Sequence, residues 1–264
     1  LMMASYVRCI TSLVASVTDK LETHFSPFSE HFRSATRSIE DSARQYVRCL
    51  YQARRRNMER MADVVAGSHY QGMHHMLSAS DWDHAGVLRQ GAIEAQERFP
   101  KGGRALVIDE SGFAKKGECS AGVARQWNGR MGKVDNCQVG VFAALAHGET
   151  ACLIDAELFL PEAWVTDVGR CIEAGIPEEA RVYRSKAGIA IGLIRRARRN
   201  GGAGGLSFDW IAADGGYGHL PWFLTELDDE GEHFLIEVHS DQSVYLQDPA
   251  PTVPPRQGKG QTPT

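Results

Sequence analysis

The sequence lacks any long hydrophobic run. Every apolar stretch in its 264 residues is interrupted by Arg, Asp, Glu or Lys before it reaches the about 18 residues that a membrane-spanning helix needs. It also lacks a C-x-x-C pair and His residues at zinc-ligand spacing, and its six cysteines are scattered. We therefore expect no membrane partner, no zinc site of the common types, and free thiols rather than a disulfide framework.

A basic net charge is also missing. The formal net charge is −4, which taken alone argues against a nucleic-acid-binding protein. Residues 1–64 nevertheless contain ten Lys or Arg and seven Asp or Glu, giving +3, whereas residues 65–264 contain nineteen and twenty-six, giving −7. Because salt screens charges beyond about 10 Å, contact with a polyanion needs a local basic face rather than a basic total. This uneven distribution of charge favours an amino-terminal module whose net charge is opposite in sign to that of the rest of the chain.

The first hundred residues have the periodicity of helices. Apolar residues recur at every third or fourth position, which marks one buried helix face. The predicted helices cover 7–21, 39–50, 58–65, 69–77 and 82–99. The last is opened by Ser80 and Asp83 at capping-box spacing. Residues 23–32 contain Pro and aromatics without this period, so they are predicted to be a connector within a helical, DNA-binding domain over 1–100.

After residue 103 the pattern changes to short, branched apolar runs. Strands are predicted at 105–109, 122–127, 137–146, 151–158, 208–213 and 233–238, and helices at 185–200 and 220–230. The first four strands are spaced like an antiparallel meander, and the helices would pack on the sheet. We expect a mixed α/β domain over 101–247. The Pro-rich and Gly-rich tail over 248–264 cannot pack a core and is predicted to be flexible.

Two aspartates, Asp109 and Asp214, follow buried apolar strands and precede small residues. A buried strand would fix each carboxylate, while Gly112, Gly215 and Gly216 leave room for a phosphate or a backbone to approach. If the two strands are neighbours, the carboxylates would bind Mg²⁺ or Mn²⁺, which prefer oxygen ligands. The alternative is that each Asp only caps the next turn or helix.

Several longer strings resemble insertion-sequence transposases of the DDE endonuclease superfamily. These strings are RNMERMA (56–62), DESGFAKKG (109–117), GVARQWNGRMGKVDNCQVGVFAAL (122–145), LIDAELFLPEAW (153–164) and ADGGYG (213–218). The resemblance covers about residues 25–255. It implies an RNase H-like sheet on which Asp109 and Asp214 are catalytic metal ligands, with two Mg²⁺ or Mn²⁺ ions in the complete family site.

The chain departs from the family pattern at the third metal ligand. The family has a Glu on a helix beyond the last strand, and no such helix precedes the Pro-rich tail, so we expect the chain to be truncated before this ligand. Glu237 and Asp241 are the nearest acidic residues, but neither has the right context. Glu110 should point away from Asp109 because side chains alternate along a strand. We expect Asp155 to be a structural cap.

Basic residues fall into two groups that suit contact with DNA phosphates. Arg54, Arg55 and Arg56 lie next to the helical module. The second group follows Asp109 and is interleaved with Trp127 and Asn128, a combination that can also stack on bases. It comprises Lys115, Lys116, Arg125, Arg130 and Lys133. The alternative for the second group is a set of solvated loop charges.

The resemblance implies metal-dependent cleavage of DNA at element ends and strand transfer to a target, in a bacterial cytoplasm at the nucleoid. The expected partner is duplex DNA, and a homodimer on the DNA is compatible with the resemblance. With the third ligand missing, we expect DNA binding with poor turnover or none. Two alternatives stay open: a non-catalytic DNA-binding or regulatory remnant, and a metal hydrolase acting on another substrate.

Overall fold

The computed structural model describes residues 19–33, 38–200 and 205–243. Most of the helix predicted over 7–21, and the whole of the tail predicted over 248–264, lie outside these residues. Within them, no helix combines the length and apolar character that crossing a bilayer requires.

The amino-terminal part is helical, as predicted. Its elements are η1 (Ser26–Phe32), α2 (Glu40–Gln52), α3 (Met58–Val64), α4 (Tyr70–Ser78) and α5 (His84–Arg98). The prediction of an irregular connector over 23–32 is wrong for η1, which is a 3-10 helix. Its position is fixed by the buried rings of Phe25 and Phe32, which stack with their centroids 5.6 Å apart. Helix α5 begins at His84 because the carboxylate of Asp83 accepts a hydrogen bond from the N–H of Gly86, at 2.8 Å.

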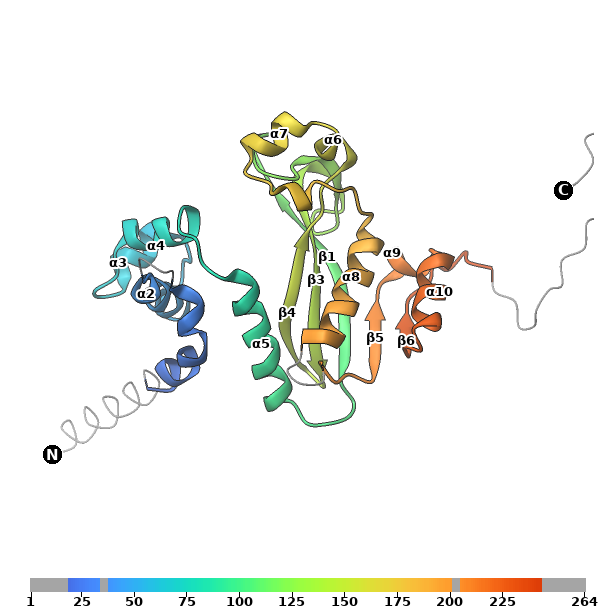
Figure 1. The fold of residues 1–264 in the computed structure, drawn as a ribbon, viewed down its shortest axis with the longest axis horizontal. Helices are drawn as coiled ribbons and strands as arrows, with labels where there is room; N and C mark the ends of the chain where they lie inside the picture. Colours follow the sequence, from blue (N-terminus) through green and yellow to red (C-terminus); the bar gives the residue numbers. More distant parts are fainter. Residues whose placement is uncertain (1–18, 34–37, 201–204, 244–264) are drawn as a thin grey trace, which may run out of the picture.

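The second part is a six-stranded mixed sheet (Figure 1). Its strands are β1 (Ala105–Ala114), β2 (Ala124–Asn128), β3 (Lys133–His147), β4 (Thr150–Leu158), β5 (Trp210–Ala213) and β6 (Phe234–Ile236). The order is β2-β3-β1-β5-β6, and β4 also pairs with β3. Strands β1, β5 and β6 are parallel to one another, and β3 is antiparallel to β1, β2 and β4.

The predicted meander is therefore only partly correct. Strand β1 pairs with β3 and not with β2, its successor in the chain. The reason is the length of β3, whose 15 residues pair with β1 along one edge and with β2 and β4, one after the other, along the other edge.

Helices connect and flank the strands. They are α6 (Glu162–Val165), α7 (Val168–Glu173), η2 (Glu178–Ala180), α8 (Lys186–Asn200), α9 (Gly215–Gly218) and α10 (Pro221–Asp229). The short elements α6, α7, η2 and α9 were not predicted. They depend on tertiary contacts: Trp164 of α6 is fully buried, and its indole N–H donates to the carbonyl of Val123 at 2.8 Å.

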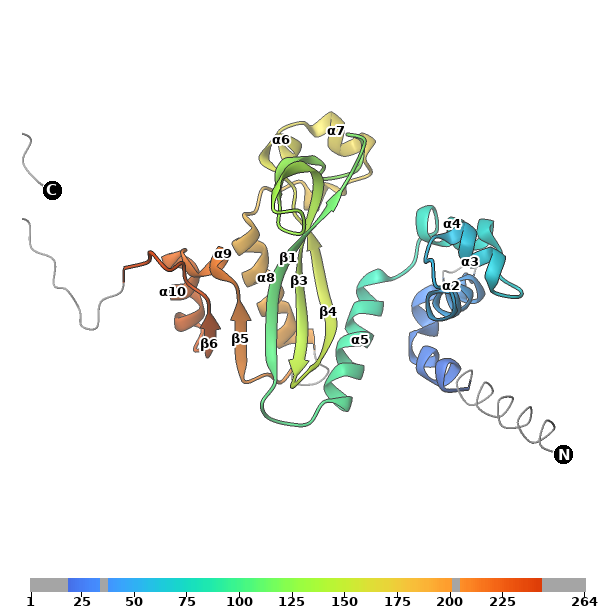
Figure 2. The same cartoon turned by 180° about the vertical axis from the view of Figure 1, so that it is seen from behind.

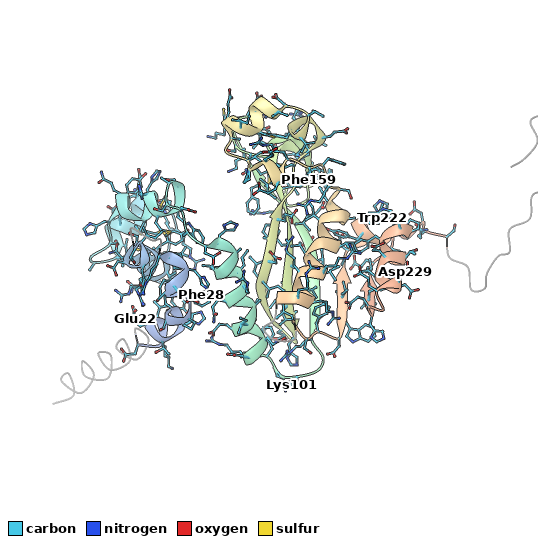
Figure 3. The ribbon with its side chains drawn as sticks, in the orientation of Figure 1. Glu22, Phe28, Lys101, Phe159, Trp222 and Asp229 are labelled. Atoms are coloured by element: carbon cyan, nitrogen blue, oxygen red, sulfur yellow. The ribbon has the colours of Figure 1, made fainter. Side chains whose placement is uncertain are left out.

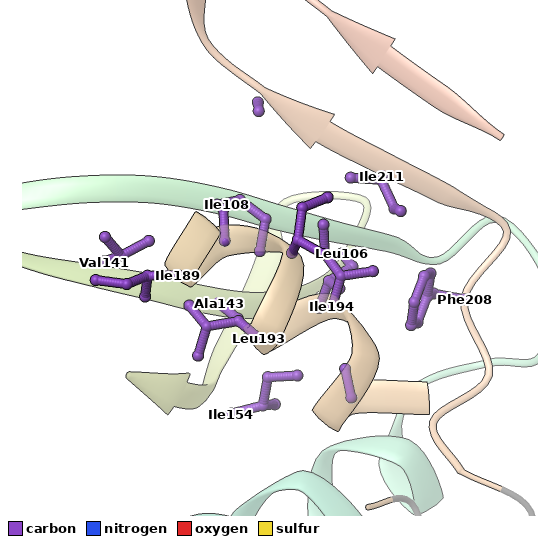
Figure 4. Packing of buried hydrophobic residues seen from close by; sticks show 14 of the residues in the cluster. Leu106, Ile108, Val141, Ala143, Ile154, Ile189, Leu193, Ile194, Phe208 and Ile211 are labelled. Atoms are coloured by element: carbon purple, nitrogen blue, oxygen red, sulfur yellow. The ribbon is translucent and has the colours of Figure 1, made fainter. Parts of the chain in front are cut away.

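One face of the sheet is covered and the other is open. Alternate residues such as Leu106 and Ile108 of β1 pack against Ile189, Leu193 and Ile194 of α8 (Figure 4). Helix α5 adds its small buried residues to the same core along β4. Seen from behind, the strands lie in front of α8, and no helix of the described residues lies over them (Figure 2). This mixed α/β arrangement, preceded by a helical region, confirms the expected fold class and is consistent with an RNase H-like fold.

The helical part and α10 lie on opposite sides of the sheet. Glu22 and Phe28 mark the amino-terminal helices in Figure 3, whereas Trp222 and Asp229 mark α10 beyond the other edge. Any site at the parallel strands β1 and β5 therefore lies on the α10 side of the molecule.

Because only one face of the sheet is covered, two leucine-to-alanine substitutions should lower the free energy of unfolding by different amounts. Leu193→Ala should lower the free energy of unfolding by about 2–5 kcal/mol, because Leu193 is completely buried under the sheet. Leu235→Ala is the matched control: Leu235 lies on β6 and is 75% exposed, so its loss should change stability by no more than about 0.5 kcal/mol. Urea unfolding measures both values, and equal costs would contradict the described packing.

Candidate active site

Asp109 and Asp214 come to lie side by side through the pairing of two parallel strands. Ile108 of β1 is the register partner of Ala213 of β5, and each aspartate is the next residue of its chain segment. Ile108 and Ala213 are buried on the α8 side, so alternation directs both aspartates to the open face. Adjacent strands are about 4.8 Å apart. Both carboxylates are exposed, and we call them the aspartate pair.

The two members of the aspartate pair differ in local structure. Asp109 was predicted to end its strand, but β1 continues to Ala114 because it remains paired with β3. Its Oδ1 accepts a hydrogen bond from the N–H of Glu110 at 2.7 Å. Asp214 is the N-cap of α9, and its Oδ1 accepts from the N–H of Gly216 at 3.0 Å. Asp214 therefore caps a helix, as the alternative interpretation predicted, but it uses only one of its two carboxylate oxygens to do so.

Glu110 points to the other face, as expected from strand alternation. Its Oε1 lies 2.7 Å from Nζ of Lys186, the first residue of α8, in a partly buried ion pair. The ammonium also lies 5.8 Å from the ring centre of Phe159. The carboxylate of Glu110 is therefore held in an ion pair on the covered face, although Glu110 directly follows Asp109 in the chain.

Tyr217 is a buried polar group beside the site that we did not predict. The residue is 2% exposed, and its hydroxyl has no hydrogen-bond partner within the described residues. Burial raises the pKa of this phenol well above its ordinary range, and the negative charges of Glu110, Asp214 and Asp109 raise it further. The phenol therefore stays protonated over the ordinary pH range. Its position in ADGGYG, three residues after Asp214, was the only signal in the sequence.

Within the described residues, no third carboxylate joins the aspartate pair. The N–H of Glu237 donates to the carbonyl of Ala213 at 3.1 Å, so the backbone of Glu237 runs beside the site. Its side chain and that of Asp241 are exposed. Across 19–33, 38–200 and 205–243, no three His, Cys, Asp or Glu side chains converge as a metal site.

Asp155 has a different structural role from the predicted cap. Its Oδ2 accepts a hydrogen bond from Nε of Arg196 on α8 at 2.8 Å, and Glu157 binds the same guanidinium at 2.9 Å. This is an ion pair between β4 and the helix that covers the sheet. It raises the pKa of Arg196 against the opposing effect of burial, so the guanidinium stays charged. The cap prediction is wrong because Asp155 lies within β4, where no helix begins.

The aspartate pair offers suitable ligands for a hard divalent cation, but only two of them. Two exposed carboxylates on one face offer the oxygens that Mg²⁺ and Mn²⁺ prefer, and such ions keep several waters in their coordination shell. The unpartnered phenol of Tyr217 could donate to an oxygen of the site, since a buried hydroxyl without a partner carries an energetic cost. Two carboxylates hold an ion less firmly than three.

The predicted DNA-binding residues form two separate surfaces. Arg54, Arg55 and Arg56 are exposed between α2 and α3, in the helical part, and Arg56 donates from Nε to the carbonyl of Leu50 at 3.0 Å (Figure 1). The second surface lies on the strands and loops that continue from β1. It comprises Lys115, Lys116, Arg125, Trp127 and Lys133, all exposed, and Lys133 lies 3.6 Å from Asp135.

Tyr217→Phe should change stability at alkaline pH. The unfolded phenol ionises near its ordinary pKa of about 10. The folded pKa is higher, so the contribution of Tyr217 to stability is complete below pH 10 and is lost as the pH rises above it. The variant lacks this loss, and near pH 7 it should equal or exceed the wild type in stability because it removes an unpartnered hydroxyl. Urea unfolding at pH 7 and above pH 10 measures both effects. Tyr51→Phe, at a 74% exposed position, is the control; identical curves for the two variants would contradict the burial of Tyr217.

Comparison with known proteins identifies the family of the chain. The chain is 28% identical over 234 residues to a protein of Microchaete diplosiphon described as "Probable transposase for insertion sequence element IS701". The aligned region covers 88% of the chain and 57% of that relative, so the chain spans little more than half of the relative's length. The family model described as "DDE superfamily endonuclease" matches residues 27–264. Because this match covers most of the sequence, the chain belongs to the DDE endonuclease superfamily.

Proposed function

We propose that the protein is a transposase-type DNA endonuclease and strand transferase acting at insertion-element ends. The observation that carries this proposal is the parallel register of β1 and β5, which directs Asp109 and Asp214 to one exposed face. Family membership and the transposase relative support the same reaction class. Duplex DNA is the proposed partner, both as element end and as target.

Asp109 and Asp214 would hold Mg²⁺ or Mn²⁺ through carboxylate oxygens on the open face. Held there, such ions would supply the chemistry of an in-line phosphoryl transfer, which is activation of the attacking oxygen and stabilisation of the leaving oxygen. Water or a 3′ hydroxyl of DNA would be the nucleophile, and no covalent protein intermediate is needed. The protein's own contribution is to fix the two carboxylates on strands whose other face is buried under α8.

We further propose that the chain turns over slowly or not at all. The described residues supply two carboxylates where the family pattern has three, which leaves the geometry of the ions less constrained. A non-catalytic DNA-binding role is the second candidate. The capping hydrogen bond of Asp214 favours it, because a structural role already accounts for one of its oxygens.

Titration with Mn²⁺ should separate these two candidates. Wild-type protein should bind the ion, and Asp109→Asn and Asp214→Asn should each weaken binding at least about tenfold, since even residues that only support metal ligands cost 10- to 100-fold when lost. Calorimetry measures the affinities.

Asp228→Asn is the matched control for this titration. Asp228 is an exposed aspartate on α10, so its substitution should leave the affinity unchanged. Equal Mn²⁺ binding by wild type and both site variants would contradict the metal site and favour the non-catalytic candidate.

Residues 1–100 are proposed to be a DNA-binding domain, with Arg54 and Arg55 contacting backbone phosphates. Each phosphate contact releases counterions, so the logarithm of the binding constant falls with the logarithm of the salt concentration by about 0.9 per contact. Removing both side chains as Ala should reduce this slope by up to about 2, roughly equally for all duplex sequences. Fluorescence anisotropy over a salt series measures the slope.

Arg199→Ala is a control that also removes a cation. Arg199 is exposed near the carboxyl terminus of α8, on the sheet domain and not in the helical part. Its loss should leave the salt slope unchanged. An unchanged slope in the variant lacking Arg54 and Arg55 would show that this loop does not bind DNA.

A further inference from the structure

A pair of aromatic rings lies next to the aspartate pair on the open face. Phe142 of β3 is the direct register partner of Asp109, so both side chains project from the same face of the sheet. Phe113, four residues beyond Asp109 on β1, projects from that face too. The rings of Phe113 and Phe142 meet edge to face, with centroids 6.1 Å apart and an interplanar angle of 64°.

The outer ring of this pair remains accessible. Phe113 is 43% exposed, although Phe is more often buried, and it lies on the part of β1 beyond Ile108 that pairs with β3 alone. Phe142 lies over Gly140, where an added Cβ would come within 2.8 Å of its ring, so the glycine leaves room for the inner ring. Phe142 therefore supports Phe113 from one side and leaves part of Phe113 open to solvent.

A positive charge lies over the exposed ring. The guanidinium carbon of Arg130 lies 6.0 Å from the centre of the Phe113 ring, within the range of a cation–π contact. Arg125, Lys115 and Lys116 are exposed nearby in the chain, and within the described residues none of these four cations makes an ion pair. A ring with one cation over it and further unpaired cations on the neighbouring chain segments suits an anionic ligand that has an aromatic face.

A strand of nucleic acid combines these two properties. Its phosphates match the cations, and its bases have flat faces that stack on aromatic side chains. A base inside a duplex has both faces covered by its neighbours, and Phe has no polar atom with which to read a groove edge. The ring of Phe113 can therefore receive a base only where that base is unpaired.

We propose that Phe113, supported by Phe142 and flanked by Arg130, is a stacking site for an unpaired nucleotide of the DNA strand bound at the aspartate pair. The proposal rests on the proposed function. It adds where on the protein a base of the DNA binds, and that this base must be unpaired. Four residues of extended strand span about 13 Å, so the stacked base lies a few nucleotides from the phosphate at Asp109. Binding at this site requires a single-stranded or opened DNA end.

The test compares two DNA ligands for the full chain in Mg²⁺. One is a blunt duplex, and the other is the same duplex extended by an unpaired oligo-dT tail at its 3′ end. Wild type should bind the tailed duplex more tightly than the blunt one. Phe113→Leu should weaken binding of the tailed duplex about tenfold and leave the blunt duplex unaffected, because stacking on a lost ring contributes at about that level per base. Fluorescence anisotropy gives the four affinities.

Two control variants keep the test specific to the ring. Phe113→Tyr retains an aromatic face and should keep the preference for the tailed duplex. Trp222→Leu removes a ring that is 47% exposed on α10, outside the proposed site, and should keep it too. Thermal unfolding confirms that each variant is folded. Equal affinity of wild type for both ligands, or a full preference in Phe113→Leu, would overturn the stacking site while leaving duplex binding in place. Failure to bind the blunt duplex as well would overturn the proposed function itself.

Discussion

The site depends on the parallel pairing of β1 with β5. This pairing is short, from Ala105 with Trp210 to Ile108 with Ala213, and it sets which faces the following residues present. Burial of Ile108 and Ala213 under α8 fixes the direction of the side chains of Asp109 and Asp214. A shift of the strand register by one residue would expose the apolar side chains and bury the aspartates. The hydrophobic core on one face therefore positions the carboxylates on the other.

The same division between faces accounts for the chemistry available on each side. On the covered face, two carboxylates are held in ion pairs with α8: Glu110 with Lys186, and Asp155 with Arg196. On the open face, the aspartate pair and the exposed ring of Phe113 have free surface toward solvent. Tyr217 is buried, its hydroxyl has no partner among the described residues, and burial keeps its phenol protonated. A large anionic ligand can reach the open face without disturbing the core.

Sequence patterns predicted the long elements well, because each satisfies its own periodicity. Helices α2, α5 and α8 and the core of β1 fall close to their predicted ranges. Elements that depend on tertiary contact were missed, such as α6, which is fixed by the buried Trp164. The adjacency of β1 and β5 could be expected from two apolar runs that each end in Asp.

The remaining features of the site required the strand register. Phe142 stands 33 positions after Asp109 in the chain, and only the pairing of β1 with β3 brings them together. The isolated phenol of Tyr217 could not be predicted because its burial depends on α9 and α10 folding against the strands. Glu110 was correctly directed away from Asp109 by alternation alone, although its partner Lys186 lies 76 residues away.

Anomalous diffraction from crystals of the protein grown with Mn²⁺ tests the central claim most directly. The account predicts a manganese peak on the sheet face opposite α8, within coordination distance of the carboxylate oxygens of both Asp109 and Asp214. Carboxylates directed to opposite faces of the sheet, or a protein whose manganese peaks all lie elsewhere, would contradict it.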